Sequence, residues 1–202
     1  MYYILVVLCA YILGSSSMSF YIGKLKGVNI KETGSKNLGA SNTMILLGWK
    51  YGVIVGIHDI AKSALAVILA VYLFPTLPYI GVIAGVASVL GHIFPFYLKF
   101  KGGKGFASYL GMTFALNWKL ALIICVVIVI ATLITDYIVI GTTLTITIVP
   151  TYFGIVTKSW AVPLILAIAT LVIIYKHRMN YVHIVKGTEI GLRSANKGEH
   201  RI

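Results

Sequence analysis

Long apolar runs separated by short polar segments dominate the chain. A membrane-spanning helix needs about 20 largely apolar residues, and seven runs reach or approach that length. We predict spans at residues 2–23, 50–74, 79–98, 105–117, 120–135, 137–157 and 160–176. Prolines 75 and 78 separate the second span from the third, and Asn117 begins the break between the fourth and the fifth. The pattern predicts an all-α, polytopic integral membrane protein with a single domain, residues 1–202.

Composition strengthens this prediction. The chain is 59% hydrophobic and 11% charged, whereas about 25% of the residues in a soluble domain are charged. Cys9 and Cys125 both lie in apolar runs, so we interpret them as small buried hydrophobes rather than as a disulfide or a metal pair. The net charge of +12 does not indicate nucleic-acid binding, because no soluble basic segment is long enough to form such a surface.

The cations are distributed very unevenly. If seven spans cross the membrane, one face receives Lys119 and Lys158, and Lys62 lies inside a span. The other face receives Lys24, Lys26, Lys31, Lys36, Lys50, Lys99, Lys101, Lys104, Lys176, Arg178, Lys186, Arg193, Lys197 and Arg201. Since cytoplasmic loops are enriched in lysine and arginine, we predict an outside N-terminus and a cytoplasmic C-terminus.

Three polar segments fall on this cytoplasmic side, where polar residues next to a bilayer indicate function. The first, residues 34–52, combines glycines with short polar side chains, among them Gly34, Ser35, Asn37 and Asn42. Glycine-rich turns expose backbone N–H groups that bind anions. The alternative interpretation is a solvated loop that caps the next helix.

The second segment, LGHIFPFYLKFKGGKGFAS at residues 90–108, offers the same chemistry more strongly. Gly102 and Gly103 allow close approach of the backbone to a ligand, and Lys101 and Lys104 supply charge. We predict a helix that begins near Gly105 and directs its positive end at the same place. These features indicate a phosphate cradle, although a loop that only marks the cytoplasmic side would also carry lysines.

The third segment, residues 175–189, places His177, Arg178 and Asn180 at a predicted helix end. His177 and Asn180 are three residues apart and therefore share a helical face. The histidine has three candidate roles, as a general base, an anion ligand or an orienting group. A capping cation at the helix terminus is the alternative.

The absence of several known motifs narrows the class of reaction that the chain is expected to catalyse. The five acidic residues form no carboxylate cluster and no His-Glu-x-x-His pair, so we expect no metal and no cofactor. The chain also lacks a His-x-x-x-x-Asp acyltransferase motif and a Gly-x-Ser-x-Gly nucleophile elbow. The remaining chemistry suits an already activated, anionic substrate.

These segments resemble the bacterial acyl-phosphate:glycerol-3-phosphate acyltransferases across nearly the whole chain. The motif residues that carry the resemblance are Gly34, Ser35, Asn37, Gly39, Ala40, Asn42 and Gly48, residues 90–105, and His177, Arg178, Asn180, Gly187 and Glu189. Asp59 and Lys62 match a D-x-x-K pair of the family.

The resemblance implies a seven-span enzyme of the bacterial inner membrane with its active site on the cytoplasmic face. It implies acyl transfer from acyl phosphate to the 1-hydroxyl of glycerol 3-phosphate, which gives lysophosphatidic acid and phosphate. We expect a monomer among membrane lipids. The implied catalytic residues are Ser35, Lys104, His177 and Asn180. The implied substrate-binding residues are Gly34, Asn37, Asn42, Lys101, Gly102, Gly103, Gly105, Arg178 and Glu189.

Several positions depart from the family pattern. Ile45 replaces an arginine, Lys36 replaces a glycine, and His183 replaces an arginine. These departures leave a catalytically impaired or substrate-shifted paralogue as one alternative. A membrane carrier of a phosphorylated small molecule is the other, although transporters place their polar sites near the midplane and this chain places them at one face.

Overall fold

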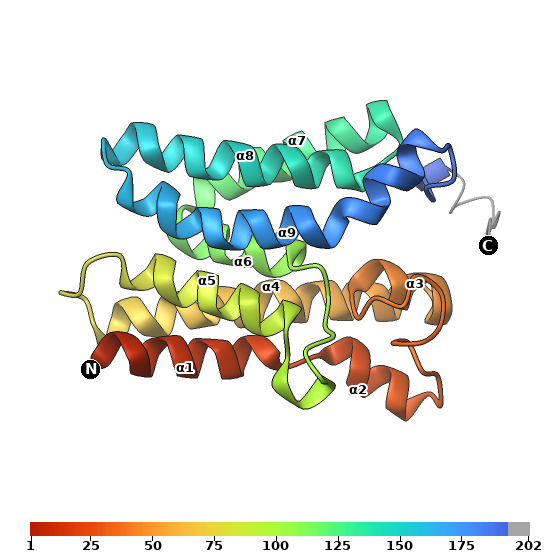
Figure 1. Ribbon diagram of the computed structural model, residues 1–202, viewed down its shortest axis with the longest axis horizontal. Coiled ribbons are helices and arrows are strands. Elements are labelled where there is room, and N and C mark those ends of the chain that lie inside the picture. The colour runs from red at the N-terminus through yellow and green to blue at the C-terminus, as the bar shows by residue number, and fades with distance from the viewer. Residues whose placement is uncertain (194–202) are drawn as a thin grey trace. The chain divides into compact units, whose positions relative to one another are not determined.

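The computed structural model describes residues 1–193, and every regular element in this range is a helix (Figure 1). The chain forms two compact units, Met1–Leu116 (unit 1) and Asn117–Ile202 (unit 2). Unit 1 contains α1 (Tyr2–Ser15), α2 (Met18–Leu25), α3 (Ala40–Leu47), α4 (Trp49–Leu73), α5 (Ile80–Ile93), the 3-10 turn η1 (Phe96–Leu98) and α6 (Phe106–Leu116). The described part of unit 2 contains α7 (Trp118–Thr135), α8 (Ile138–Thr157) and α9 (Ala161–Val185).

Six segments are long and apolar enough to cross a membrane, and they correspond to six of the seven predicted spans. The predicted span 105–117 forms α6, which has only 11 residues. At 1.5 Å per residue this helix is about 16 Å long, roughly half the thickness of a bilayer's hydrocarbon core. The all-helical membrane fold is therefore confirmed, with a fourth span shorter than a full crossing.

The structure differs from the predicted boundaries in three places. The first span is broken at Ser16, where α1 ends before α2 begins. The polar segment 34–52 contains the short helix α3. The last helix continues past the apolar run to Val185 and is followed by Gly187 with a φ of +67°. His177 and Asn180 therefore lie inside α9, because polar side chains do not end a helix and a left-handed glycine does.

Small residues bring the helices of unit 1 into close contact. A Cβ atom added to Gly14 of α1 would lie 2.1 Å from the Ser88 carbonyl oxygen of α5. One added to Gly111 of α6 would lie 2.0 Å from the Ile60 carbonyl oxygen of α4. Such contacts are typical of membrane helices, whose association depends on close packing rather than on the hydrophobic effect.

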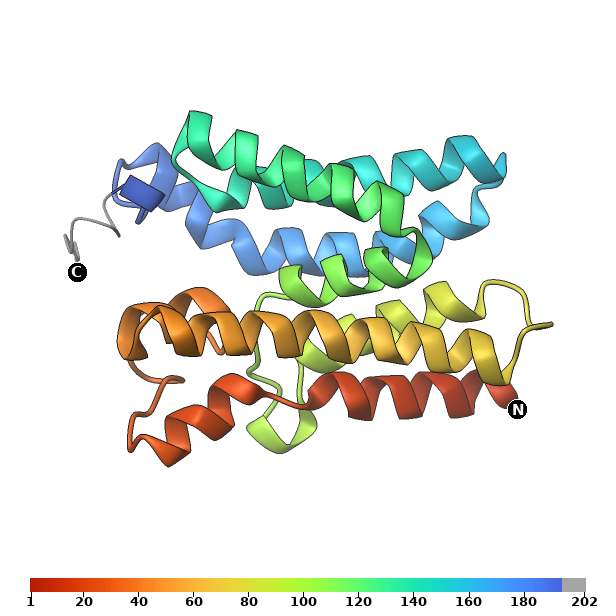
Figure 2. The same ribbon diagram turned by 180° about the vertical axis from the view of Figure 1, so that it is seen from behind.

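Most cations lie in or near the connections between helices. In unit 1, α1 begins and α4 ends at one end, the connection 26–39 lies at the other, and the connection 94–105 lies away from the first end, near the middle (Figure 2). The cations of unit 1 other than Lys50, in the first turn of α4, and Lys62 occupy or border these two connections. In unit 2, Lys119 lies in the first turn of α7 and Lys158 follows α8, whereas Lys186 follows α9 and Arg193 donates to the Leu133 carbonyl oxygen near the end of α7. Lys197 and Arg201 lie outside the described residues.

Candidate functional site

The loop between η1 and α6 carries the glycines of the second polar segment (the glycine loop, residues 99–105). The backbone N–H of Gly102 donates to the Ile93 carbonyl oxygen at 3.1 Å, and that of Gly103 donates to the His92 carbonyl oxygen at 3.2 Å. A Cβ on Gly102 would lie 2.1 Å from the His92 carbonyl oxygen. The two glycines therefore allow the backbone of the loop to approach the end of α5 closely. Both amides are engaged within the fold, and α6 begins at Phe106, as predicted.

Gly105 has a left-handed backbone with a φ of +93°, which favours glycine at this position. Lys104 is half-buried and Lys101 is exposed, so the two charges differ in their access to water. The glycine loop thus presents its lysines just before the N-terminus of a helix, where anions are stabilised.

Asn42 organises the loop that carries Ser35. Its Oδ1 accepts the backbone N–H of Ser35 at 3.0 Å, while its Nδ2 donates to the carbonyl oxygens of Ile30, Thr33 and Asn37, each at 3.1 Å. The Asn42 side chain is 1% exposed, so it shapes the loop from within rather than from its surface.

Gly34 and Ser35 occupy the surface of this loop. Gly34 has a φ of +62°, and a Cβ there would lie 2.4 Å from Asn42 Oδ1. Ser35 is exposed, and Asn37 is half-buried. Two positions that depart from the family pattern are nearby in sequence: Lys36 is exposed and Ile45 is half-buried on α3.

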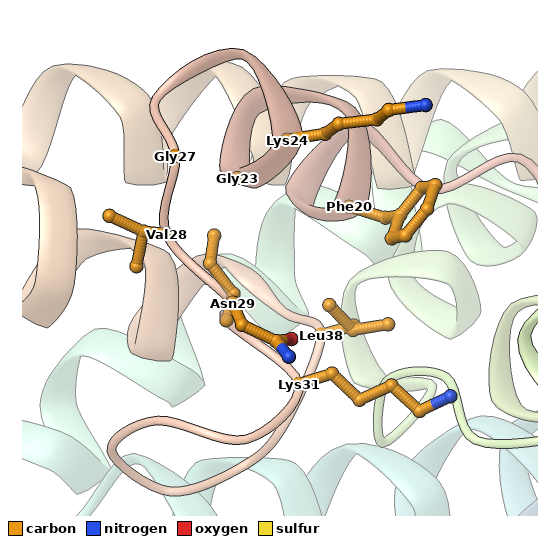
Figure 3. A pocket seen from close by; sticks show the side chains of 9 residues that line it. Phe20, Gly23, Lys24, Gly27, Val28, Asn29, Lys31 and Leu38 are labelled. Atoms are coloured by element: carbon orange, nitrogen blue, oxygen red, sulfur yellow. The ribbon is translucent and has the colours of Figure 1, made fainter.

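The structure brings the first two polar segments together in unit 1. Lys31 Nζ donates to the Leu98 carbonyl oxygen at 2.8 Å, and Leu98 packs with Ile30 and Leu38 in one apolar cluster. Beside this contact lies an open pocket of about 410 Å³. Figure 3 shows its lining, which includes the side chains of Phe20 and Lys24 and none of the predicted site residues.

The D-x-x-K pair forms a buried ion pair in α4. Lys62 Nζ lies 2.8 Å from Asp59 Oδ1, and both side chains are less than 5% exposed. Lys62 Nζ also donates to the Ser16 carbonyl oxygen at 2.6 Å, at the break between α1 and α2. The sequence marks this pair as charges inside an apolar run, but the partner Ser16 lies 46 residues away and no periodicity indicates it.

The third polar segment lies on and after α9 in unit 2. His177 is buried, and its Nδ1 lies 2.9 Å from the Ile173 carbonyl oxygen. Because a carbonyl only accepts, Nδ1 carries a proton, and Nε2 of the neutral ring is left as the basic nitrogen. Nδ1 thus fixes the orientation of the imidazole ring, and Nε2 can accept a proton.

Asn180, inside α9, contacts Glu189, which lies beyond the end of this helix. Asn180 Nδ2 donates to Glu189 Oε1 at 2.5 Å, and His183 Nδ1 lies 3.5 Å from Glu189 Oε2. Arg178, in contrast, turns back on its own helix. It donates to the Tyr175 carbonyl oxygen at 2.9 Å, and its guanidinium lies 4.0 Å from the centre of the Tyr175 ring.

Comparison with known proteins identifies the chain's relatives. The family model described as glycerol-3-phosphate acyltransferase matches residues 4–187. A curated relative, glycerol-3-phosphate acyltransferase 1 of Oceanobacillus iheyensis, is 40% identical over 96% of this chain and 97% of its own length.

Two solved structures are also similar. The glycerol 3-phosphate form of PlsY (YgiH), an integral membrane glycerol 3-phosphate acyltransferase, is 32% identical, with a TM-score of 0.90 and 98% of each chain covered. Its lysophosphatidic acid form is 33% identical, with a TM-score of 0.85 and 95% of each chain covered. A family model that spans most of the chain, together with a relative 40% identical over nearly its whole length, shows that this chain belongs to the glycerol-3-phosphate acyltransferase family.

Proposed function

We propose that this protein transfers a fatty acyl group from acyl phosphate to the 1-hydroxyl of glycerol 3-phosphate, the first step of phospholipid synthesis. The products are lysophosphatidic acid and phosphate. The observation that carries the proposal is the family match over residues 4–187. The similar solved structures, described as glycerol 3-phosphate and lysophosphatidic acid forms, support the acceptor and the product.

The reaction needs positioning more than activation. Acyl phosphate is a mixed anhydride, so its carbonyl carbon is already reactive. The 1-oxygen of glycerol 3-phosphate attacks that carbon, the bond from the carbon to the phosphate oxygen breaks, and phosphate leaves. The enzyme must hold two anions together against their repulsion, which fixed cations and N–H groups accomplish at a partly desolvated site.

We propose Ser35, Lys104, His177 and Asn180 as the catalytic residues. Lys104 and the N-terminus of α6 offset the phosphate charge. The hydroxyl proton goes either to His177 Nε2 or to the departing phosphate. The fixed Nδ1 proton of His177 supports the first route, because it leaves Nε2 as the acceptor.

The substrate-binding residues follow from the same motifs. Lys101, Gly102, Gly103 and Gly105 form the glycine loop at the proposed phosphate site. Gly34, Asn37 and Asn42 shape and present the loop of Ser35, in line with the four hydrogen bonds of Asn42. Glu189 orients Asn180 through the contact between them, and Arg178 contributes positive charge.

We further propose that the N-terminus lies outside, that the C-terminus and the active site lie on the cytoplasmic side of the bacterial inner membrane, and that residues 1–202 act as one monomeric domain. The charge distribution supports this orientation, since the lysine-rich connections of unit 1 lie away from the end at which α1 begins and α4 ends. The positive-inside rule assigns such an end to the cytoplasm.

The test is turnover by the purified protein in lipid nanodiscs. Phosphate release from acyl phosphate should require glycerol 3-phosphate, and Lys104→Ala should abolish it. A lack of release at millimolar substrate would contradict the proposal. Growth of a strain that lacks its own enzyme distinguishes an active enzyme from an impaired paralogue, and uptake of glycerol 3-phosphate into proteoliposomes would indicate a carrier instead.

A further inference from the structure

A cluster of charged and polar side chains lies buried between α4 and α5 of unit 1. Asp59 and Lys62 come from α4 and His92 from α5, and their exposed fractions are 2%, 4% and 6%. Ionisable groups inside a membrane-spanning segment are costly, and a buried ion pair often adds no net stability over apolar residues of similar volume. We therefore expect this cluster to have a role other than holding two helices together.

The cluster is connected to the glycine loop through His92. Lys62 Nζ lies 2.9 Å from His92 Nδ1. Since an ammonium group only donates, Nδ1 is the acceptor in this contact, and the proton of a neutral ring lies on Nε2. Asp59 Oδ1 lies 2.8 Å from Lys62 Nζ, so the carboxylate holds the lysine; the same oxygen lies 3.3 Å from His92 Nδ1, but two acceptors form no hydrogen bond with each other.

The opposite edge of the His92 ring lies against the loop. A Cβ on Gly103 would lie 2.0 Å from His92 Nε2, which shows how closely this ring edge fits the backbone of Gly103. The His92 carbonyl oxygen accepts the Gly103 N–H as well. His92 therefore meets the loop with both its ring and its backbone, and rotation of the ring would displace the loop.

We propose that Lys62 is a positioning residue for the glycine loop, acting through His92, with Asp59 holding the lysine in place. Lys62 fixes the rotation of the imidazole, and the imidazole fixes the backbone of Gly103, next to Lys104. The lysine itself touches no substrate. This inference rests on the proposed function insofar as the loop holds the phosphate of glycerol 3-phosphate.

The decisive variant is the double substitution Asp59→Asn/Lys62→Met. Lys62→Met alone would leave Asp59 buried without its counter-charge and could unfold the protein, whereas the double variant removes both charges and keeps the volume. Ser63→Ala is the matched control, because it removes the buried 2.8 Å hydrogen bond to Ser88 between the same two helices without touching His92.

We expect the double variant to raise the KM for glycerol 3-phosphate about tenfold, with kcat changed less than threefold and the KM for acyl phosphate unchanged. Ser63→Ala should leave all three constants near those of the parent. Gly103→Ala can also be combined with the double variant. If Lys62 acts through the loop, the combined fold-increase in KM should be smaller than the product of the two separate fold-increases. An unchanged KM, or effects that multiply, would overturn the proposal.

A measurement without turnover separates this inference from the proposed function. Hydrogen–deuterium exchange at the Gly102 and Gly103 amides reports their hydrogen bonds to α5 directly. Exchange should become at least tenfold faster in the double variant and stay unchanged in Ser63→Ala. Equal protection in all three proteins would refute the positioning role even if the enzyme is active. Faster exchange in a protein without acyltransferase activity would refute only the proposed function.

Discussion

The Oδ1 atom of Asn42 accepts the backbone N–H of Ser35 at 3.0 Å, so a buried amide on α3 determines the shape of the loop that presents an exposed serine. The two residues are seven positions apart, and the loop between them has no regular structure of its own until α3 begins. The loop depends on this one side chain because its backbone groups find few partners in one another.

Asn42→Ala is expected to lower the free energy of unfolding by about 2 kcal/mol or more, because one buried and three half-buried backbone groups lose their partner. It should also reduce kcat/KM through the displacement of Ser35. Thermal unfolding and phosphate release measure the two effects. Thr33→Ala is the control, since Thr33 contributes only its backbone carbonyl to Asn42; a similar loss in this control would mean that the loop tolerates no change at all.

Gly34→Ala should destabilise the protein more than Gly27→Ala. Both glycines have a positive φ, +62° and +68°, which costs an alanine about 1 kcal/mol. A Cβ at Gly34 would in addition collide with Asn42 Oδ1, whereas one at Gly27 would meet nothing within 4 Å. Unfolding temperatures measured side by side test this difference, and equal losses would show that the amide of Asn42 moves aside freely.

His177→Ala should lower kcat by about 10²-fold or more, the usual contribution of a positioned general base. His177→Gln retains a donor for the Ile173 carbonyl but lacks a comparably basic atom. If the departing phosphate takes the proton, the glutamine variant should keep most of its turnover. Single-turnover rates with saturating substrates distinguish the two routes.

Glu189→Ala should lower kcat/KM about tenfold, because Asn180 loses the acceptor that orients it. Glu189→Gln retains an oxygen acceptor and should lose less. Glu32→Ala is a matched control, since Glu32 accepts from Asn29 Nδ2 at 2.7 Å in a similar but exposed pair. A loss of kcat/KM as large in Glu32→Ala as in Glu189→Ala would contradict a specific role for the contact between Asn180 and Glu189.

The proposed orientation predicts which introduced cysteines react from outside the cell. In a background without Cys9 and Cys125, a membrane-impermeant maleimide should label Lys158→Cys in intact cells and should label Lys36→Cys only after lysis. The reverse pattern would place the lysine-rich end outside and contradict the positive-inside assignment.

Hydrophobic runs predicted the helices well because membrane spans are long and nearly free of charge. The polar stretches were harder to predict. Residues 40–47 form a helix although glycines flank them, and His177 lies within α9 although the apolar run ends at Tyr175. In both places backbone hydrogen bonding, which sequence polarity does not report, decides the structure.

The candidate site was predictable in part. Glycines next to lysines indicated the loop at residues 99–105, but the reason for Gly103 lies in the ring of His92, eleven residues earlier. The partners of Lys62 are spread between Ser16 and His92. Contacts over such separations arise from helix packing and leave no local pattern in the sequence.

The hydrogen bond from Lys62 to the Ser16 carbonyl oxygen has a consequence for biogenesis. A break in a membrane helix leaves backbone acceptors that lipid cannot satisfy. Here the donor belongs to α4, which is synthesised 46 residues after the break. The first span therefore gains this partner only once α4 has entered the membrane beside it, and the two segments are expected to leave the insertion machinery as a pair.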